Sequence, residues 1–392
     1  MRLALVLILA ACTTAPLDPI RPDPDVLLVD SFDGSGELRA DGVASVIGGI
    51  VITGTAAEPT GDYIWHARIA ADGTVAWRRQ YDQLFGVSPR CCTTTSATVD
   101  GSLVLDDFQN LVAFDGDGFI TASAALSQVP SGRAAATPDG GLLVPLGSAI
   151  AKISPAGEIT NLVGVGGDGF ATNVAAAPDG GMLVFGLTIS GVAGIARLDA
   201  ASSFVYQVSG GPAGSAGSAE PTADGGAIVL VDAPEPWLAR LEPTGELRWQ
   251  RTLRYTLALP EAPHAIRAVE QGDGTIIVFG TGNSPWVMLV DAAGTLLGDR
   301  RLSRTPSEVV VVDGEAVIFG QFDDHRGVLH RPRDLSAGEC SGGLGAAQLE
   351  LVDAAEVLAP ADLGFAAPPA ITLAPTNLLS RASDIELSAG CP

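Results

Sequence analysis

The chain has 392 residues, 47% of them hydrophobic, and a formal net charge of −23 at pH 7. So acidic a surface repels phosphate backbones, which argues against nucleic acid as a direct partner. Lys152 is the only lysine, so the chain has almost no side chain for Schiff-base chemistry or for a lysine general base.

The first residues, MRLALVLILAAC, predict an export signal. One early positive charge, a short apolar core and small residues before Cys12 are typical of a secretion signal and too short for a membrane span. The run LAAC ending at Cys12 resembles the bacterial lipobox, whose cysteine receives diacylglycerol and, after cleavage, an acyl chain such as palmitate on its new amine. The resemblance predicts a lipoprotein signal peptide over residues 1–11 and lipidation of Cys12. The alternative is an ordinary signal with a chance cysteine.

Residues 12–25 contain the lipidated cysteine and a linker rich in Pro and Asp. Proline keeps such a segment semi-extended, so it tethers the domain near the bilayer. By resemblance to lipoprotein sorting, Thr13 after the cysteine favours the outer membrane of a bacterial cell envelope. The membrane is therefore a predicted partner through the lipid anchor.

A short-strand repeat fills residues 26–335. In one copy, the turn Pro178-Asp179-Gly180-Gly181 separates two apolar runs, since Pro and Gly supply the backbone angles of a tight hairpin. Seven copies align on the glycine before the second strand, at intervals of roughly 40 to 50 residues. These glycines are Gly49, Gly101, Gly141, Gly181, Gly226, Gly274 and Gly314. Four strands per copy predict an all-β fold, a seven-bladed β-propeller of four-stranded antiparallel blades.

The aromatic side chains occupy two positions of the repeat. The third-strand position carries Trp65, Trp237 and Trp286, and the fourth-strand position carries Trp77, Trp249 and Tyr206. Large rings at equivalent places predict packing between neighbouring blades. The alternative is a stacking platform for a sugar or a quinone.

The two ends of the repeat array have complementary defects. The segment VLLVDSF, starting at Val26, looks like a fourth strand without a blade, whereas the last copy has three strands and is interrupted by Pro332. Because unpaired sheet edges are costly, we expect the first segment to complete the last blade beside residues 327–331.

Residues 336–392 lack the repeat signature. Short alternating pieces such as QLELVD, ITLAP and DIELS predict an irregular β extension on one face or edge of the propeller, with a loose tail as the alternative. Cys340 and Cys391 bracket this extension, and an exported chain favours disulfides, so we predict a Cys340–Cys391 bond. Cys91 and Cys92 form either a vicinal disulfide or bonds elsewhere.

The remaining candidates for chemistry favour structural roles. Asp323, Asp324, His325 and His330 carry metal-ligand side chains, but an acidic chain is expected to have such loops. His66 and His264 are expected at a surface or an interface, and the Asp115-Gly116-Asp117-Gly118 turn lacks the later ligands of a calcium loop. We therefore predict no catalytic residue, cofactor or metal.

The repeats resemble those of exported quinone-dehydrogenase-like β-propellers. The segments DGTVAW, ending at Trp77, and TGELRW, ending at Trp249, look like the end of that family's docking motif. The resemblance implies a quinone against vicinal cysteines, for which Cys91 and Cys92 are a match, and a central calcium, for which no ligands can be assigned. A second architectural resemblance is to the outer-membrane assembly lipoprotein, a non-catalytic propeller.

These observations predict a lipid-anchored envelope propeller that acts as a non-catalytic binding or scaffolding module. Its expected partner is an envelope protein or glycan, contacted by loops at one mouth of the propeller. The alternatives are a quinone-dependent dehydrogenase or hydrolase on the same fold, and a purely structural surface lipoprotein, because a fold alone does not fix a function.

Overall fold

The computed structural model describes most of the chain after the linker. The described residues are 26–31, 38–46, 49–58, 61–70, 74–82, 94–98, 100–105, 109–164, 170–187, 192–214, 216–256, 261–302, 305–312, 315–321, 327–330, 347–355, 357–361, 363, 370–375, 380–382 and 385–389. Strands β1 to β33 lie in them, and no helix occurs in this part of the chain.

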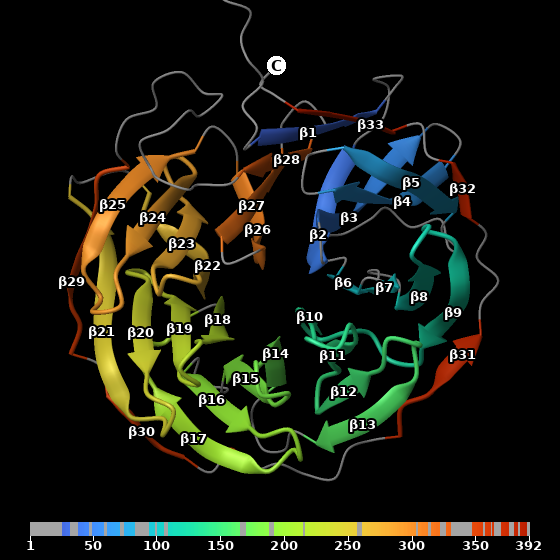
Figure 1. Cartoon of the computed structure of the whole chain (residues 1–392). Coiled ribbons are helices and arrows are strands. Elements are labelled where there is room, and N and C mark those ends of the chain that lie inside the picture. Colours follow the sequence, from blue (N-terminus) through green and yellow to red (C-terminus); the bar gives the residue numbers. More distant parts are fainter. Residues whose placement is uncertain are drawn as a thin grey trace, which may run out of the picture.

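The described strands form seven antiparallel sheets arranged radially around one centre, which confirms the predicted propeller (Figure 1). We number them as blades in chain order. Blade 1 contains β2 (Leu38–Val46), β3 (Gly49–Glu58), β4 (Gly61–Ala70) and β5 (Val75–Asp82). Blade 2 contains β6 (Thr94–Thr98), β7 (Gly101–Leu105), β8 (Asn110–Asp115) and β9 (Ile120–Leu126). Blade 3 contains β10 (Ala135–Ala136), β11 (Leu142–Pro145), β12 (Ala149–Ile153) and β13 (Ile159–Gly164).

The remaining blades repeat the pattern. Blade 4 contains β14 (Phe170–Ala176), β15 (Met182–Leu187), β16 (Ala193–Leu198) and β17 (Phe204–Gly210). Blade 5 contains β18 (Ala216–Pro221), β19 (Ala227–Asp232), β20 (Trp237–Leu241) and β21 (Leu247–Tyr255). Blade 6 contains β22 (His264–Glu270), β23 (Ile276–Thr281), β24 (Trp286–Val290) and β25 (Leu296–Arg301). Blade 7 contains β26 (Thr305–Val312), β27 (Glu315–Gln321), β28 (Gly327–His330) and β1 (Val26–Ser31).

The hairpin between first and second strands explains its two glycines. In blade 4, the amide of Gly180 donates to the carbonyl of Ala177 at 3.0 Å, and Asp179 Oδ1 accepts from the amide of Gly181 at 2.9 Å. Gly180 has a φ of 82°, a left-handed conformation that glycine adopts without a steric penalty. The aligned glycine of this blade is the next residue, Gly181, where a Cβ would collide with the carbonyl oxygen of Leu198 on the third strand. The aligned glycines lie within two residues of the start of a second strand.

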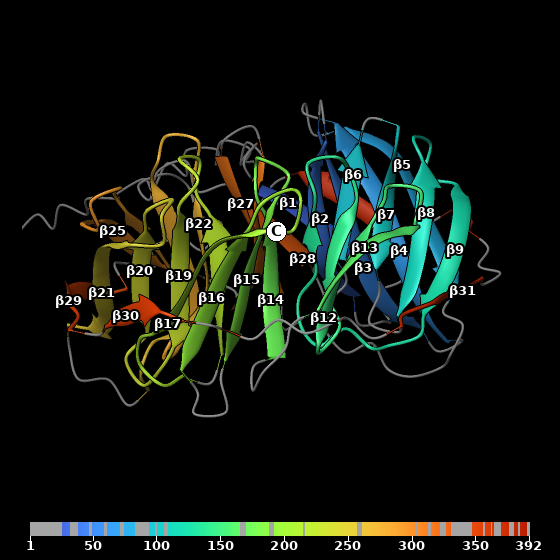
Figure 2. The same ribbon diagram turned by 90° about the horizontal axis from the view of Figure 1, so that it is seen from below.

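The antiparallel meander gives the ring two unlike faces. Hairpins from first to second and from third to fourth strands lie on one face, which we call the turn face. Connections from second to third strands and from blade to blade lie on the opposite face, the connection face. Figure 2 views the ring from its side, with the strands running from one face to the other.

The first strand closes the ring. β1 takes the fourth place in blade 7, where Val26 pairs with His330 and Val29 pairs with Gly327 of β28. This pairing confirms the predicted closure. Because β28 ends on the turn face, Val26 also lies at the turn-face end of β1, so residues 1–25 join the ring there.

Five C-terminal strands add an outer layer that we call the belt. It consists of β29 (Leu349–Asp353), β30 (Leu358–Pro360), β31 (Leu373–Pro375), β32 (Ser380–Ala382) and β33 (Ile385–Ala389). They pair in turn with β21, β17, β9, β5 and β1, so the belt runs around the ring against chain order (Figure 1). The sequence predicted a β extension on a face or edge, and the described part lies on the outer edges. A loose tail is excluded for these residues.

The belt also contributes apolar side chains to the seams between blades. Leu349 is buried in the cluster shared by blades 5 and 6, and Leu358 packs on the cluster of blades 4 and 5. Leu363 packs on the cluster of blades 3 and 4, and Ile371 is buried in that of blades 2 and 3. The belt therefore covers unpaired strand edges and shields the outer ends of successive seams from water.

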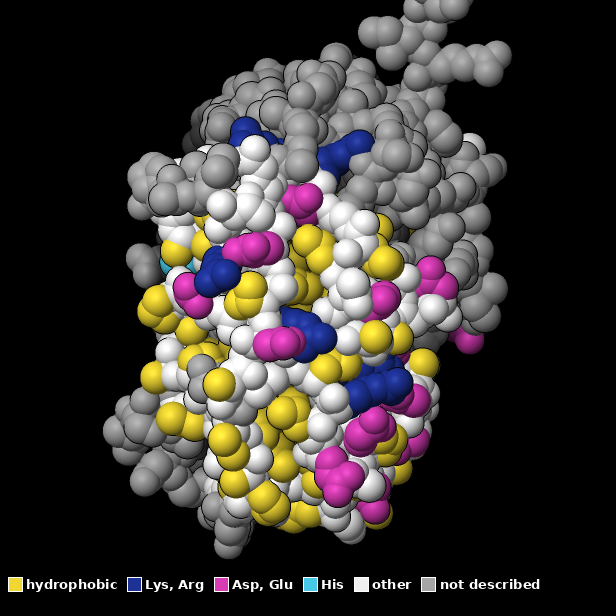
Figure 3. Space-filling model, turned by 90° about the vertical axis from the view of Figure 1, so that its left-hand side faces the viewer, with side chains coloured by type: hydrophobic (Ala, Val, Ile, Leu, Met, Phe, Trp, Pro, Cys, Tyr) yellow, Lys and Arg dark blue, Asp and Glu magenta, His cyan; other side chains and the backbone are white. Residues whose placement is uncertain are grey.

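Ion pairs fix the belt to blade 5. Arg254 Nε lies 2.6 Å from Glu350 Oε1, and Arg251 Nη1 lies 2.9 Å from Asp353 Oδ1. Figure 3 shows this outer wall, where basic and acidic side chains lie beside one another among apolar ones. These pairs are partly exposed, so each adds at most about 1 kcal/mol and mainly fixes the register of β29 on β21.

The structure places the repeat aromatics between blades. Trp65, Trp237 and Trp286 lie on third strands and are at most 1% exposed. The fourth-strand rings reach the following blade: Trp77 Nε1 donates to the carbonyl of Gly116 at 2.7 Å, and Trp249 Nε1 donates to that of Ala292 at 2.9 Å.

Each fourth-strand ring rests on a glycine of the next turn. A Cβ on Gly118, whose φ is 79°, would lie 2.6 Å from the Trp77 ring. The same approach brings Trp249 against Gly294 and Tyr206 against Gly245. Burial raises the pKa of Tyr206 to about 12. The ring and the glycine therefore form one interlocking contact between blades.

We predict that deleting residues 13–32 lowers the melting temperature by more than about 5 °C relative to deleting only residues 13–24. The longer deletion removes β1, which pairs with β28 and also with β33 along Leu27 to Ser31. Thermal unfolding of both deletion variants measures the difference. Equal melting temperatures would show that closure by β1 contributes nothing to stability.

Candidate functional site

The first strands of all seven blades surround a central channel of about 420 Å³. Most of its lining is small or hydroxylated, and includes Gly42, Ala44, Thr94, Ser96, Ala136 and Ala176. The charged residues of the lining are Arg133, Glu220, Arg267 and Glu270. The volume falls within the ~300–1,000 Å³ typical of small-molecule pockets.

An ion pair crosses from blade 5 to blade 6 in the channel wall. Arg267 Nε lies 2.7 Å from Glu220 Oε1, and Arg267 Nη1 donates to the carbonyl of Val309 in blade 7 at 3.2 Å. Both charged side chains are mostly buried, so this pair is a fixed part of the wall that links three first strands.

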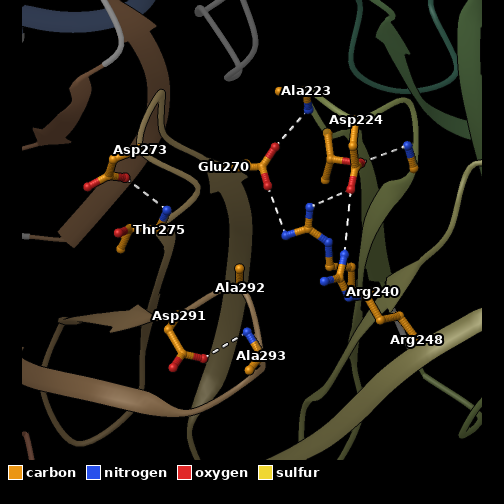
Figure 4. A network of polar contacts seen from close by, with 12 residues as sticks. Ala223, Asp224, Arg240, Arg248, Glu270, Asp273, Thr275, Asp291, Ala292 and Ala293 are labelled. Atoms are coloured by element: carbon orange, nitrogen blue, oxygen red, sulfur yellow. Dashed lines mark hydrogen bonds and ion pairs between the residues drawn. The ribbon is translucent and has the colours of Figure 1, made fainter.

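A second network joins the same blades at the turn face (Figure 4). Glu270 Oε1 lies 2.8 Å from Arg240 Nη1, and Glu270 Oε2 accepts from the amide of Ala223 at 2.7 Å. Arg240 also lies 3.0 Å from Asp224. Burial favours the neutral form of Asp224, but hydrogen bonds from Thr222, the Gly226 amide and Arg240 outweigh it and lower its pKa.

Blade 4 contains an equivalent pair between a third-strand arginine and a turn aspartate. Arg197 donates to both carboxylate oxygens of Asp179 at 2.7 Å, which is the main reason that the pKa of Asp179 is lowered. The third strands of blades 1, 3, 4 and 5 carry the same motif of Ala, a basic residue and then Ile or Leu. Its basic members are Arg68, Lys152, Arg197 and Arg240. This recurrence was the sequence signal that could have predicted these contacts.

His66 is fully buried between blades 1 and 2. Its Nδ1 lies 2.7 Å from Thr53 Oγ1 and its Nε2 lies 2.7 Å from Ser102 Oγ, while Thr95 donates to Thr53 at 2.8 Å. Its ring stacks on Phe114 at 4.4 Å. Burial lowers the pKa of His66 to about 3. The expected surface or interface position is therefore an interface one, and the ring is a neutral hydrogen-bonding core residue.

The other sequence candidates lie apart from one another. His264 begins β22, with Nδ1 3.4 Å from Asp232 Oδ2, and is well exposed. Asp115 Oδ1 accepts from the amides of Asp117 and Phe119, so this segment is a capped turn. Cys12, Cys91, Cys92, Cys340, Cys391 and the Asp323 to His325 segment lie outside the described residues, and the side chain of His330 is not described.

The described residues contain neither a metal-binding cluster nor a membrane-spanning helix. No group of three or more His, Cys, Asp or Glu side chains in this part of the chain is placed to hold a metal ion. The same residues contain no helix long and apolar enough to cross a membrane.

Two known lyase structures share the propeller fold with this chain. Virginiamycin B lyase from Staphylococcus aureus superposes with a TM-score of 0.52 at 13% identity, over 78% of this chain and 98% of the lyase. A streptogramin B lyase gives 0.51 at 13% identity, over 79% and 99%. BamB from Moraxella catarrhalis gives 0.43 at 14% identity, over 74% and 85%. No family model and no curated protein matches the sequence.

At these identities, the likeness extends to the fold alone. The class defined by fold and site is thus a seven-bladed β-propeller with a polar central channel.

We predict that His66 makes the protein sensitive to acid. The buried ring stays neutral until about pH 3, whereas the unfolded chain binds a proton at its ordinary pKa of about 6.5. Stability therefore falls as pH drops between these values, by about 1.4 kcal/mol per pH unit from this residue. Urea unfolding across this range should give a shallower loss for His66→Gln than for the wild type. Equal slopes for the two proteins would contradict the assignment.

We predict that Glu270→Gln destabilises the protein by about 3 kcal/mol, because the buried Arg240 loses a charged partner. The matched control is Glu242→Gln, whose carboxylate lies 3.6 Å from Arg248 in an exposed pair and contributes less than about 1 kcal/mol. Chemical denaturation of both variants measures the two changes. A similarly small loss of unfolding free energy in both variants would mean that the network in Figure 4 does not stabilise the contact between blades 5 and 6.

Proposed function

We propose that this protein is a lipid-anchored propeller of the bacterial outer membrane that acts as a non-catalytic binding or scaffolding module. The support for the anchor is the lipobox-like run ending at Cys12. The proposed partner is an envelope protein or glycan that contacts the connection face.

The direction of β1 carries the proposal. Its first residue, Val26, pairs with His330 at the turn-face end of blade 7. An anchor at Cys12 would therefore join the ring from the turn face. The 13 linker residues span at most ~40 Å when extended, so this attachment favours a turn face directed towards the bilayer.

The two faces also differ in how much chain they present. Turn-face hairpins are short and capped by their own side chains, as at Asp291, which accepts from the amides of Ala293 and Thr295. The connection face carries longer segments, including residues 127–134 between β9 and β10. Loops on a rigid scaffold are the usual place for recognition residues, so the face directed away from the membrane is the better candidate for partner binding.

We predict that partner crosslinks form from the connection face and not from the turn face. A photo-crosslinking amino acid at the exposed Val129 or Glu235 samples the connection face, and the same amino acid at the exposed Ala156 or Ala293 samples the turn face. Crosslinking in intact membranes, followed by mass spectrometry, should give a specific adduct at the first pair only. Adducts confined to Ala156 and Ala293 would reverse the proposed orientation.

The Cys12→Ala variant tests the anchor in the same experiment. It should release the protein from membranes, or leave it unprocessed, and weaken crosslinks from Val129 and Glu235. A processed Cys12→Ala chain that still fractionates with membranes would overturn the lipid anchor and leave the connection-face contact to be judged by the crosslinks alone.

A further inference from the structure

The lining of the central channel includes a polar side chain whose hydrogen bonds are incomplete. Ser96 lines it on β6 and is 1% exposed, and its Oγ has no hydrogen-bond partner among the described residues. A buried hydroxyl left unpaired costs free energy, so a group in the channel that completes its hydrogen bond would bind favourably.

The backbone adds donors and acceptors to the same space. Each first strand, from β2 to β26, is the terminal strand of its sheet. Its inner edge therefore presents amide and carbonyl groups to the channel. Among the described residues, one isolated β-bridge lies between Arg133 and Asn173. Because Gly42, Ala44 and Ala136 have small side chains, they leave this backbone accessible to a ligand.

The charges in the wall argue against a charged ligand. Glu220 is paired with Arg267, and Glu270 is paired with Arg240. An anion or a cation would have to break one of these buried pairs. Breaking the pair costs more free energy than the new contact with the ligand provides. Arg133 is likewise engaged in an interaction of its own.

The lining also argues against a flat aromatic ligand, because no Trp, Tyr, Phe or His is among the described lining residues. A ligand suited to this site is small and uncharged, and both donates and accepts hydrogen bonds. Hydroxyl groups do both.

We propose that the central channel is a binding site for a small neutral polyhydroxylated molecule of the monosaccharide class. Hydroxyls of the ligand would satisfy Ser96 and the backbone edges of the first strands, while the Glu220–Arg267 pair would offer fixed polar atoms on the opposite wall. This site is separate from the partner surface on the connection face.

The test uses the full-length protein in detergent and sugars of similar size but different charge. Glucose and N-acetylglucosamine are neutral, glucuronate is an anion and glucosamine is a cation. Saturation-transfer difference NMR and calorimetric titration should detect binding of at least one neutral sugar in the millimolar range or tighter. Binding of glucuronate or glucosamine should be at least about tenfold weaker, a difference of about 1.4 kcal/mol.

Variants locate the binding site. Ala136 lines the channel and is exposed, so Ala136→Trp should fill the space and abolish binding of the neutral sugar. The control Ala122→Trp adds the same ring at an exposed position of β9, outside the channel, and should bind as the wild type does. Ser96→Ala should weaken binding by about fivefold, because it removes one buried hydrogen-bonding group. This smaller change keeps the test valid if Ala136→Trp does not fold.

Several outcomes would overturn the proposal. These are no binding of either neutral sugar to the wild type, equal binding to a folded Ala136→Trp variant, unchanged affinity in Ser96→Ala, or tighter binding of a charged sugar. None of these outcomes alters the crosslinking pattern expected for the connection face, so the two proposals fail separately.

Discussion

The structure depends on the burial of blade faces against one another. A single four-stranded blade has two apolar faces and cannot exclude water from either of them, so each blade is stable only between two neighbours. The buried clusters show this directly: Phe185 of blade 4 and Trp237 of blade 5 belong to one cluster, and Leu230 of blade 5 and Trp286 of blade 6 belong to the next. A row of such contacts leaves two exposed blade faces unless the ends meet. The closure of blade 7 by β1 is therefore required by the same burial that holds every other seam.

The belt satisfies a second constraint, which is that the backbone at the outer edge of each blade needs hydrogen-bond partners. A propeller hides the inner edges around a narrow channel but leaves fourth strands unpaired on the outside. The belt pairs with five of these strands in the described chain. Its last strand, β33, also pairs with β1, so the strand nearest the linker is held on both sides. The first and last described strands thus meet in one sheet, where β33 lies outside the four strands that complete blade 7.

The sequence predicted what each repeat specifies locally. Turn glycines such as Gly180 need a positive φ wherever they occur, and aromatic residues such as Trp249 recur at one position of the strand pattern, so both can be recognised without knowing the neighbouring blade. The pieces QLELVD, ITLAP and DIELS were recognised as β-like, and they contain β29, β31 and all but the last residue of β33. Their partners could not be predicted, because pairing of β29 with β21 joins residues about a hundred positions apart and leaves no local pattern.

The candidate site was hidden for the same reason. Ser96, Glu220 and Arg267 come from three blades, and nothing near any of them in the sequence marks a shared cavity. His66 was visible as a histidine, but its partner Ser102 lies in the next blade, so its burial depended on a contact that only the fold supplies.

The distribution of regular and irregular structure then limits where this protein can recognise other molecules. The outer wall is largely occupied by the belt and by ion pairs such as Arg254–Glu350. On the turn face, the side chains that could bind a ligand already serve the fold: Asp179 is held by Arg197, and Asp224 by Arg240. Repetition itself has this effect, because a residue that must cap a turn in every blade is not available for recognition in any one of them.

The surfaces without this constraint are the connection face and the channel, where neighbouring blades differ from one another. Specific binding requires such differences, since a ligand is recognised by an asymmetric set of groups. The channel has this asymmetry, with hydroxyls and small side chains on blades 1 to 3 and paired charges on blades 5 and 6.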